Sequence, residues 1–499
     1  MNSYFLLQPM TVALIGGFLM IFLHFKNDRV RNIYSEVIAL VTTVLVWIAL
    51  IKADGSAVTL YRFTYGFTIS FGVDGLSKLF AGMVSLMWPF ALLYAFEYMK
   101  DDKRKNVFFA FYLMTYGITL GVCFSSNITT LYVFYEMLSL VTIPLVSHYG
   151  DHESMYAGRK YAAYTIGGAS LAFFAVVIAT VYGGGGNFIY GGSLGAARAA
   201  SGNTMSMGML QIAFLFGFFG FGAKAAVFPL HDWLPTASVA PTPVTALLHA
   251  VAVVNTGAFA VMRLTWYLYG ADLIKGSWVQ AACLIAAEFS LVYGAVQALR
   301  ERRFKRRLAF STMSNLSYML FGIMLLTPMG YLGGLSHMLF HGVIKMSLFL
   351  CAGAFMRQTG KNYVFEINGV GRKMPVTFIC YTLGALSLTG IPLFCGFISK
   401  WTLISAGADE GSALGIIGVV ALIVSAFLCA MYTLTVSVRA FFPMKGKDFY
   451  ADGTEGSAVK EAGWQMLVPV VVFTIANVLF GVFSEPIMSF LTKIAEGVI

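Results

Sequence analysis

Apolar runs of about 20 residues recur along the whole chain and restrict the folds that it can adopt. Such a run is long enough to cross a bilayer as a helix, and lipid offers no hydrogen-bond partner to backbone that is not helical. The sequence therefore predicts an all-α polytopic membrane protein. About fourteen spans are expected, centred near residues 14, 42, 84, 116, 137, 171, 218, 254, 287, 317, 344, 386, 424 and 477.

The composition supports this prediction. Hydrophobic residues make up 58% of the chain and charged residues only 11%, whereas about a quarter of a soluble protein is charged. We expect no soluble domain longer than a loop. The first run, residues 4–25, lacks a basic n-region and a small-residue cleavage site, so we expect a retained span and not a signal peptide.

Lysine and arginine residues cluster after alternate predicted spans. The clusters follow the first, third, fifth, ninth, eleventh and thirteenth spans (Lys26, Arg29, Arg31; Lys100, Lys103, Arg104, Lys105; Arg159, Lys160; Arg300, Arg302, Arg303, Lys305, Arg306, Arg307; Arg357, Lys361, Arg372, Lys373; Arg439, Lys445, Lys447, Lys460). The positive-inside rule then places these loops in the cytoplasm and both termini on the extracytoplasmic side of a prokaryotic cell membrane. Because orientation accounts for the net charge of +10, the charge does not indicate nucleic-acid binding.

Neither the cysteines nor the glycine-rich segment indicates a cofactor. The six cysteines lie singly in apolar runs, without the spacing of zinc or iron–sulfur sites. The glycines at 183–186 have no Lys-Ser/Thr after them, so we interpret them as a linker and not as a P-loop. We therefore expect no cofactor, no metal and no catalytic or redox site in the chain itself.

Among the ionisable residues inside predicted spans, seven are the strongest candidates for an ion pathway, because charges at membrane depth are typical of such pathways. They are Glu136, Lys224, His249, His337, His341, Lys345 and Lys400. The histidine pair and Lys345 are spaced i, i+4, i+8, so on a helix they share one face over about 12 Å and form a candidate proton wire. Lys224 precedes Pro229 and Lys400 follows Pro392, and we expect both helices to break at these prolines.

Structural explanations exist for several of these residues. Taken alone, His249 could equally be a packing residue with hydrogen-bonded ring nitrogens. Lys400 could be an interfacial lysine whose side chain snorkels to the membrane surface. The His337–His341 pair lacks an evident third metal ligand. Four unpaired charges at membrane depth (Glu136, Lys224, Lys345 and Lys400) would nevertheless cost on the order of 10 kcal/mol, which disfavours a purely structural role for all four.

Four stretches carry a resemblance to a known family. KAAVFPLHDWLPTASVAPTPVTALLHA, HMLFHGVIKMSLFLCAG, NGVGRKMPVT and LTGIPLFCGFISK resemble the antiporter-like subunits of respiratory complex I, energy-converting membrane hydrogenases and Mrp-type cation/proton antiporters. The resemblance implies fourteen helices, with helices 4–8 and 9–13 as inverted repeats and helices 7 and 12 broken. It divides the chain into residues 1–106, a first repeat at 107–265, a second at 266–410 with 411–440, and a C-terminal loop and helix at 441–499.

The same resemblance implies roles for individual residues. Glu136 resembles the glutamate of the fifth helix, although Tyr135 stands where Trp is usual, and Lys224 resembles the lysine that pairs with it. The histidines and lysines at 249, 337, 341, 345 and 400 match the remaining positions of the central axis. Asn255 occupies a position where several subtypes have lysine, so this axis has one charge fewer. Thr236 replaces a common acidic residue.

Function is expected to be ion translocation with other membrane subunits, including paralogues, as partners. The leading hypothesis is a subunit of a redox-driven complex that moves H+ or Na+. The alternatives are a component of an Mrp-type antiporter and a proton-coupling component of an inorganic-carbon uptake complex. In each case, opening of the Glu136–Lys224 pair would push a proton through water and His249 toward Lys345 and Lys400.

Overall fold

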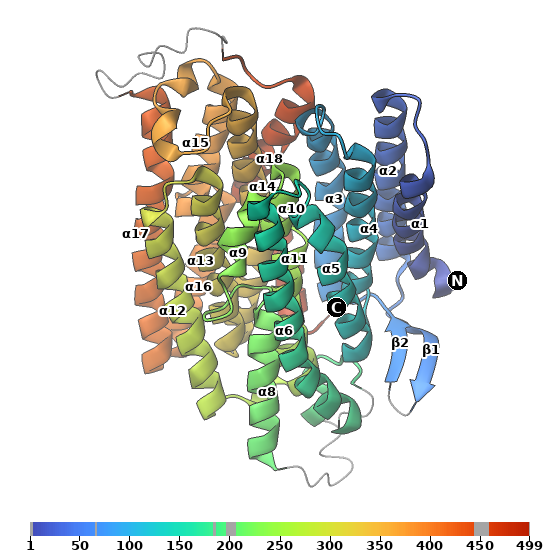
Figure 1. The fold of residues 1–499 in the computed structure, drawn as a ribbon. Coiled ribbons are helices and arrows are strands. Elements are labelled where there is room, and N and C mark those ends of the chain that lie inside the picture. Colours follow the sequence, from blue (N-terminus) through green and yellow to red (C-terminus); the bar gives the residue numbers. More distant parts are fainter. Residues whose placement is uncertain (1–2, 65–66, 183–185, 196–205, 444–458, 499) are drawn as a thin grey trace.

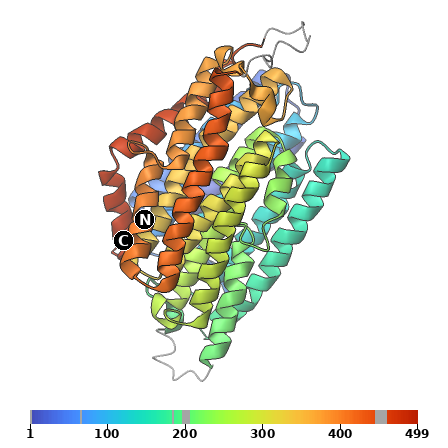
Figure 2. The same cartoon turned by 90° about the vertical axis from the view of Figure 1, so that its left-hand side faces the viewer.

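A computed structural model describes residues 3–64, 67–182, 186–195, 206–443 and 459–498 as a bundle of long, nearly parallel helices (Figures 1 and 2). The α-helices are α1 (Gln8–Phe22), α2 (Asp28–Lys52), α3 (Gly75–Tyr98), α4 (Lys105–Cys123), α5 (Ile128–Val146), α6 (His152–Tyr182), α8 (Met207–Gly222), α9 (Trp233–Thr236), α10 (Thr242–Ala250), α11 (Val253–Met262), α12 (Trp278–Arg300), α13 (Phe304–Met324), α14 (Pro328–Thr359), α15 (Pro375–Thr389), α16 (Cys395–Glu410), α17 (Ala413–Phe441), α18 (Trp464–Val482) and α19 (Glu485–Ala495). Short 3-10 helices are η1 (Ser3–Leu7), η2 (Ala237–Val239), η4 (Ala271–Leu273), η5 (Val364–Ile367) and η6 (Val370–Arg372), and η3 (Arg263–Tyr269) is π-helical.

Eleven helices in the described residues are long and apolar enough to cross a membrane, and α8 and α15 are shorter apolar helices. Every predicted span centre lies within a helix. The prediction of an all-α polytopic membrane protein is therefore confirmed. One small element was not predicted, an antiparallel hairpin of β1 (Val58–Thr64) and β2 (Phe67–Phe71) between the second and third spans.

Polar side chains fix where several helices begin. The side chains of Asn27, Asp74, Asn127, Ser277 and Thr327 each accept a hydrogen bond from a backbone N–H in the first turn of the helix that follows. These N–H groups have no partner within the helix, so a capping side chain stabilises the start of the span.

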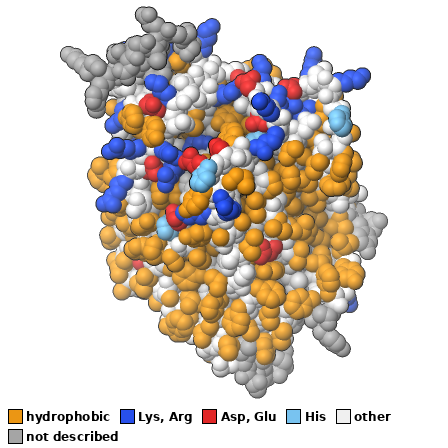
Figure 3. Space-filling model, in the orientation of Figure 1, with side chains coloured by type: hydrophobic (Ala, Val, Ile, Leu, Met, Phe, Trp, Pro, Cys, Tyr) orange, Lys and Arg blue, Asp and Glu red, His pale blue; other side chains and the backbone are white. Residues whose placement is uncertain are grey.

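Charged side chains gather over one end of the bundle, the upper part of Figure 3, where ion pairs join the loops. Lys105 pairs with Asp28 at 2.6 Å, Arg303 pairs with Glu153 at 2.6 Å, and Arg357 pairs with Asp101. We call the end that carries these pairs the basic end. The predicted basic clusters to which these residues belong therefore meet on one side, although Arg31 and Lys305 are buried, and Lys445 and Lys447 lie outside the described residues.

Two segments form the centre of the bundle. The span Thr242–Tyr269, which contains α10 and α11, is 100% buried within the protein, and α14 is 94% buried over its apolar window. By contrast, only 33% of the corresponding window of α17 is buried. The helices that carry His249, Asn255, His337, His341 and Lys345 are therefore shielded from lipid by the surrounding helices.

Three spans are interrupted near the middle of the bundle. α8 ends at Gly222 and α9 begins at Trp233, so Pro229 lies within the first interruption. Pro392 lies in the second, between α15 and α16. A third interruption, at residues 251–252 between α10 and α11, was not predicted.

Side chains satisfy carbonyl groups that the interruptions release. Trp233 Nε1 donates to the Ala223 carbonyl at 2.8 Å, and Asn255 Nδ2 donates to the Ala250 carbonyl at 2.8 Å. Buried carbonyls without such donors would be costly in a low-dielectric interior.

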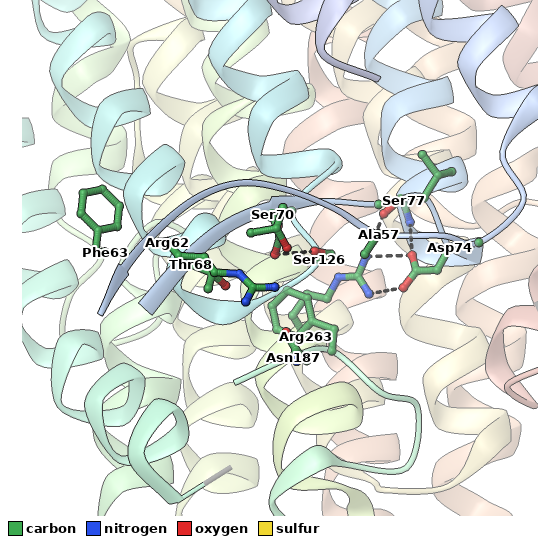
Figure 4. Close-up of a pocket in the computed structure, with 16 residues that line it drawn as sticks. Ala57, Arg62, Phe63, Thr68, Ser70, Asp74, Ser77, Ser126, Asn187 and Arg263 are labelled. Carbon is green, nitrogen blue, oxygen red and sulfur yellow. Dashed lines mark hydrogen bonds and ion pairs between the residues drawn. The ribbon is translucent and has the colours of Figure 1, made fainter. Parts of the chain in front are cut away.

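An ion pair fixes the N-terminal helices to the buried centre at the end opposite the basic end. Arg263 donates to both carboxylate oxygens of Asp74 and, at 2.9 Å, to Ser77 Oγ (Figure 4). The pair lines a cavity of about 790 Å³ together with the hairpin residue Arg62. Burial alone would raise the pKa of Asp74, but the Arg263 guanidinium and the Ser77 donors hold it below its usual value.

We expect Asp74→Asn to lower the thermal unfolding midpoint at pH 7, because Arg263, whose side chain is only 1% exposed, loses its counter-charge. The loss should be smaller than the roughly 3–5 kcal/mol of a fully buried pair, since the Asp74 side chain is 35% exposed. A carboxyl with a depressed folded pKa contributes stability above its unfolded pKa of about 4, and the contribution disappears as pH falls through the folded value.

The measurement is a thermal melt of the purified protein at pH 7 and at acidic pH, where the difference from wild type should shrink. Asp54→Asn is the matched control, because Asp54 is an exposed carboxylate close to the same hairpin. Equal midpoints for Asp74→Asn and Asp54→Asn at pH 7 would show that the ion pair does not stabilise the fold.

Candidate functional site

Lys224 lies in the first residues of the α8–α9 interruption and is fully buried. Its Nζ donates to the Tyr135 carbonyl of α5 and lies 3.5 Å from the centroid of the Tyr135 ring. The backbone at Lys224 packs tightly on Gly257 of α11, where an added Cβ would come within 2.8 Å of the Lys224 carbonyl carbon. The interruption is thereby held against both α5 and the central span.

Glu136, the next residue along α5, does not pair directly with Lys224. No ion pair within 4.0 Å joins the two side chains among those that the structure describes, and Glu136 instead accepts a hydrogen bond from Tyr132 at 3.3 Å. Glu136 is only partly buried. The carbonyl and ring of Tyr135 occupy the place beside the ammonium group, so the pair implied by the resemblance is open here.

His249 and Asn255 flank the α10–α11 interruption. The His249 ring stacks on Phe349 of α14 with 4.8 Å between centroids, and both of its nitrogens lack a protein partner. Asn255 uses its amide nitrogen on the Ala250 carbonyl, while Oδ1 remains unpartnered. Gly342 of α14 packs against the Ala250 carbonyl, which brings this interruption beside His341.

His337, His341 and Lys345 follow one another on α14. The two imidazole centroids are 5.8 Å apart, and His337 Nδ1 lies 2.9 Å from Ser399 Oγ of α16. Lys345 Nζ donates to the Leu308 carbonyl at 3.1 Å and to Ser311 Oγ at 2.7 Å. The expected face of α14 thus presents two imidazoles and one amine to neighbouring helices.

Lys400 lies at the second predicted interruption, where Nζ donates to the Leu388 carbonyl at 2.6 Å and to the Thr389 carbonyl at 3.2 Å. Only 5% of Lys400 is exposed, which argues against a snorkelling side chain. Its Nζ lies 5.0 Å from the centroid of Tyr318, and the same ring stacks on His337 at 5.2 Å. Lys400 is therefore connected to the histidine pair.

The structure brings the predicted residues into one buried line from Lys224, past Asn255 and His249, along α14 to Lys400. Glu136 lies beside the first end of this line. Neutral carbonyl, hydroxyl and aromatic groups are the partners of the three lysines. Unpartnered imidazole nitrogens next to amines are suited to passing protons through water. No group of three His, Cys, Asp or Glu side chains within the described ranges is arranged to hold a metal ion.

Sequence patterns did not identify several members of the site. Tyr135, Ser311 and Ser399 are hydrogen-bond partners of the predicted residues, and Tyr432 donates to Ser311. Such hydroxyls and carbonyls carry no distinctive spacing. Lys305 was assigned to a cytoplasmic loop with its neighbouring arginines, but it is only 8% exposed and donates to the Ala240 carbonyl at 2.7 Å. The burial of Lys305 becomes evident only in the structure, where α13 packs against η2.

If Lys345 serves ion movement and not stability, Lys345→Met should leave the thermal unfolding midpoint unchanged or raise it, because a buried amine is replaced by an apolar chain of similar length. Neither former partner is orphaned: Ser311 still receives the Tyr432 hydroxyl at 2.8 Å, and the Leu308 carbonyl the Thr312 hydroxyl at 3.0 Å. Ile344→Ala, at the adjacent buried position, should lower the midpoint through a loss of about 2–5 kcal/mol. A comparable loss in Lys345→Met would make the lysine structural.

Comparisons with known proteins find similarity over most of the chain. Residues 125–442 match the family described as "NADH:quinone oxidoreductase/Mrp antiporter, TM", and residues 63–109 match "NADH-Ubiquinone oxidoreductase (complex I), chain 5 N-terminus". The chain is 30% identical to NADH-quinone oxidoreductase subunit N of Desulforudis audaxviator over 84% of this chain and 82% of that protein.

Two further similarities extend the range of relatives. The chain is 30% identical to a Na(+)/H(+) antiporter subunit of Alkalihalophilus pseudofirmus over 84% of its own length, but it spans only 53% of that longer protein. A subunit of the membrane-bound sulfane sulfur reductase, an archaeal respiratory membrane complex, has the same fold, with a TM-score of 0.84 and 20% identity over 99% of this chain and 97% of that one.

Proposed function

We propose that this chain, which belongs to the NADH:quinone oxidoreductase/Mrp antiporter transmembrane family, translocates protons as one subunit of a multi-subunit membrane complex. The observation that carries the proposal is the buried line from Lys224 to Lys400. Each unpaired charge at membrane depth costs roughly 2.5–3.5 kcal/mol on insertion scales. A fold without a use for these amines would be more stable with apolar residues in their place.

The chemistry of the line favours H+ over Na+. Hard cations such as Na+ need several oxygen ligands, whereas ammonium groups repel them and N–H groups cannot coordinate them. Glu136 is the one carboxylate among the predicted axis residues. Amines and imidazoles instead bind and release protons, so the axis suits proton relay, and Na+ remains the alternative ion.

Proton movement is proposed to start at the open Glu136–Lys224 pair. When Glu136 lies close to Lys224, the carboxylate stabilises the ammonium form; when they separate, as here, this stabilisation weakens. Lys224 then releases its proton toward His249 and the water that Asn255 can bind. From His249 the proton continues to the α14 residues, Lys345 or the two histidines His341 and His337, and then to Lys400. Repulsion between successive positive charges drives each step.

Two kinds of membrane complex are compatible with this mechanism, and the similar proteins suggest both. In the first, a redox arm on other subunits drives pumping; in the second, an Mrp-type assembly exchanges cations for protons. We propose the first, with the basic end in the cytoplasm, both termini outside and paralogous subunits as neighbours. The resemblance to two inverted five-helix repeats belongs to the same proposal. Copurification of the intact complex decides the setting: flavin and iron–sulfur content supports the first, and its absence with Na+-dependent exchange supports the second.

Glu136→Gln and Lys224→Met should each reduce proton translocation about tenfold or more, because one removes the controlling charge and the other the proton carrier. The assay is the initial rate of acidification or alkalinisation in proteoliposomes containing the purified complex. Glu485→Gln, on an exposed helix start, is the control. Wild-type rates in both axis variants, at equal assembly, would refute the proposed pathway.

Lys400 tests the far end of the line. Lys400→Gln should block translocation, and Lys400→Arg should impair it as well, because guanidinium does not release its proton in a protein. Lys493→Gln on the exposed side of α19 should behave as wild type. If Lys400→Arg translocates protons normally, the residue supplies only a fixed positive charge and is not a carrier.

A further inference from the structure

A cavity of about 360 Å³ opens at the basic end, between the end of α3, the α5–α6 turn, η2 and the beginning of α13. Its walls carry both apolar and polar groups, and the hydroxyls of Tyr98 and Ser238 and the Arg303–Glu153 ion pair are among the polar ones. Lys305 also lines the cavity. Such a space can hold several water molecules, because it is roomy and offers hydrogen-bond partners.

Lys305 differs from the arginines around it. It is 8% exposed, and its Nζ donates inward to the Ala240 carbonyl at 2.7 Å. No carboxylate lies within 4.0 Å of its amine among the described ion pairs, whereas Arg303 and Arg306 pair with Glu153 and Glu301. Lys305 therefore resembles the lysines of the buried line more than a membrane-orientation residue.

Two features place Lys305 near the centre, a shared hydrogen-bond acceptor and its position on α13. The Ala240 carbonyl also accepts the Thr245 hydroxyl at 3.0 Å, and Thr245 stands one turn before His249 on the same face of α10. On α13, Lys305 lies three residues before Leu308 and six before Ser311, the two partners of Lys345. Six residues rise about 9 Å along a helix, so Lys305, at the cavity wall, stands about 9 Å along the axis of α13 from a partner of Lys345.

We infer that Lys305 is a proton entry group, which loads the middle of the buried line from this cavity, and that translocation requires both this loading and the Glu136–Lys224 pair. The neutral amine of Lys305 takes a proton from a hydronium ion in the cavity and releases one of its three protons inward, through water, to His249 or Lys345. This inference rests on the proposed translocation of protons. It adds a second entrance and a carrier to the pathway.

A structural explanation competes with this inference, because Lys305 could simply supply a hydrogen bond and a positive charge to the Ala240 carbonyl at the start of α10. The six native cysteines are all buried, so Lys305→Cys can be modified in the native background. Two cationic methanethiosulfonate reagents then separate the explanations. An aminoethyl group restores an amine that can release a proton, whereas a trimethylammonioethyl group restores only a permanent charge.

The experiment measures proton translocation by the complex in proteoliposomes with the basic end accessible. We expect Lys305→Cys to lose about tenfold or more of the rate, aminoethyl modification to restore it and trimethylammonioethyl modification to leave it low. Ala309→Cys, fully buried one turn further along α13, should take up neither reagent. Mass spectrometry of the intact subunit gives the extent of labelling.

Each other outcome contradicts the inference. If both reagents restore the translocation rate, Lys305 supplies only a structural charge. If neither restores the rate at full labelling, the amine is irrelevant. If position 305 is not labelled, the cavity does not reach it. A normal rate in unmodified Lys305→Cys refutes the entry role alone, provided that Glu136→Gln remains inactive. Normal rates in both variants refute the proposed function itself. If Lys305→Cys does not assemble, Lys305→Arg replaces it, and wild-type translocation by that variant overturns the inference.

Discussion

Amines buried without carboxylates are the constraint on which the rest of this structure depends. Lys224, Lys305, Lys345 and Lys400 all lie in the interior, and none forms an ion pair within 4.0 Å among those described. Their partners are carbonyls, hydroxyls and aromatic rings, which stabilise an ammonium group without supplying a full counter-charge. A carboxylate at each position would hold the proton in place, whereas neutral partners let each lysine give it up.

The interruptions of the helices and the buried amines depend on each other. A helix that ends inside the bundle leaves carbonyls without intrahelical partners, and Lys400 binds two such carbonyls at the end of α15. Tyr135 provides a similar connection at α8: its hydroxyl donates to the Phe221 carbonyl at 3.0 Å, while its own carbonyl accepts from Lys224. The polar groups that we propose to conduct protons therefore also keep the broken helices assembled, which explains how such a costly interior can persist.

Sequence alone predicted the spans because length and hydropathy are local properties, and it singled out the residues of the proposed axis because a charge inside an apolar run is conspicuous. It missed the α10–α11 interruption, since Ala250, Val251 and Ala252 include no proline or glycine. It also placed Lys305 in a loop, because a lysine among arginines gives no sign of burial until η2 packs over it. The open Glu136–Lys224 pair depends on side-chain conformation, which no residue pattern specifies.

Helix α14 is 32 residues long and uninterrupted, so it measures about 48 Å and exceeds the roughly 30 Å hydrocarbon core. His337, His341 and Lys345 ride on this single rigid element, whereas Lys224 and Lys400 adjoin breaks in their own spans. The separations among the three central groups are therefore a constant of the fold. In the proposed pathway, control by neighbouring subunits would therefore act at the flanks, where the helices are interrupted, and the middle section would conduct protons over a fixed length.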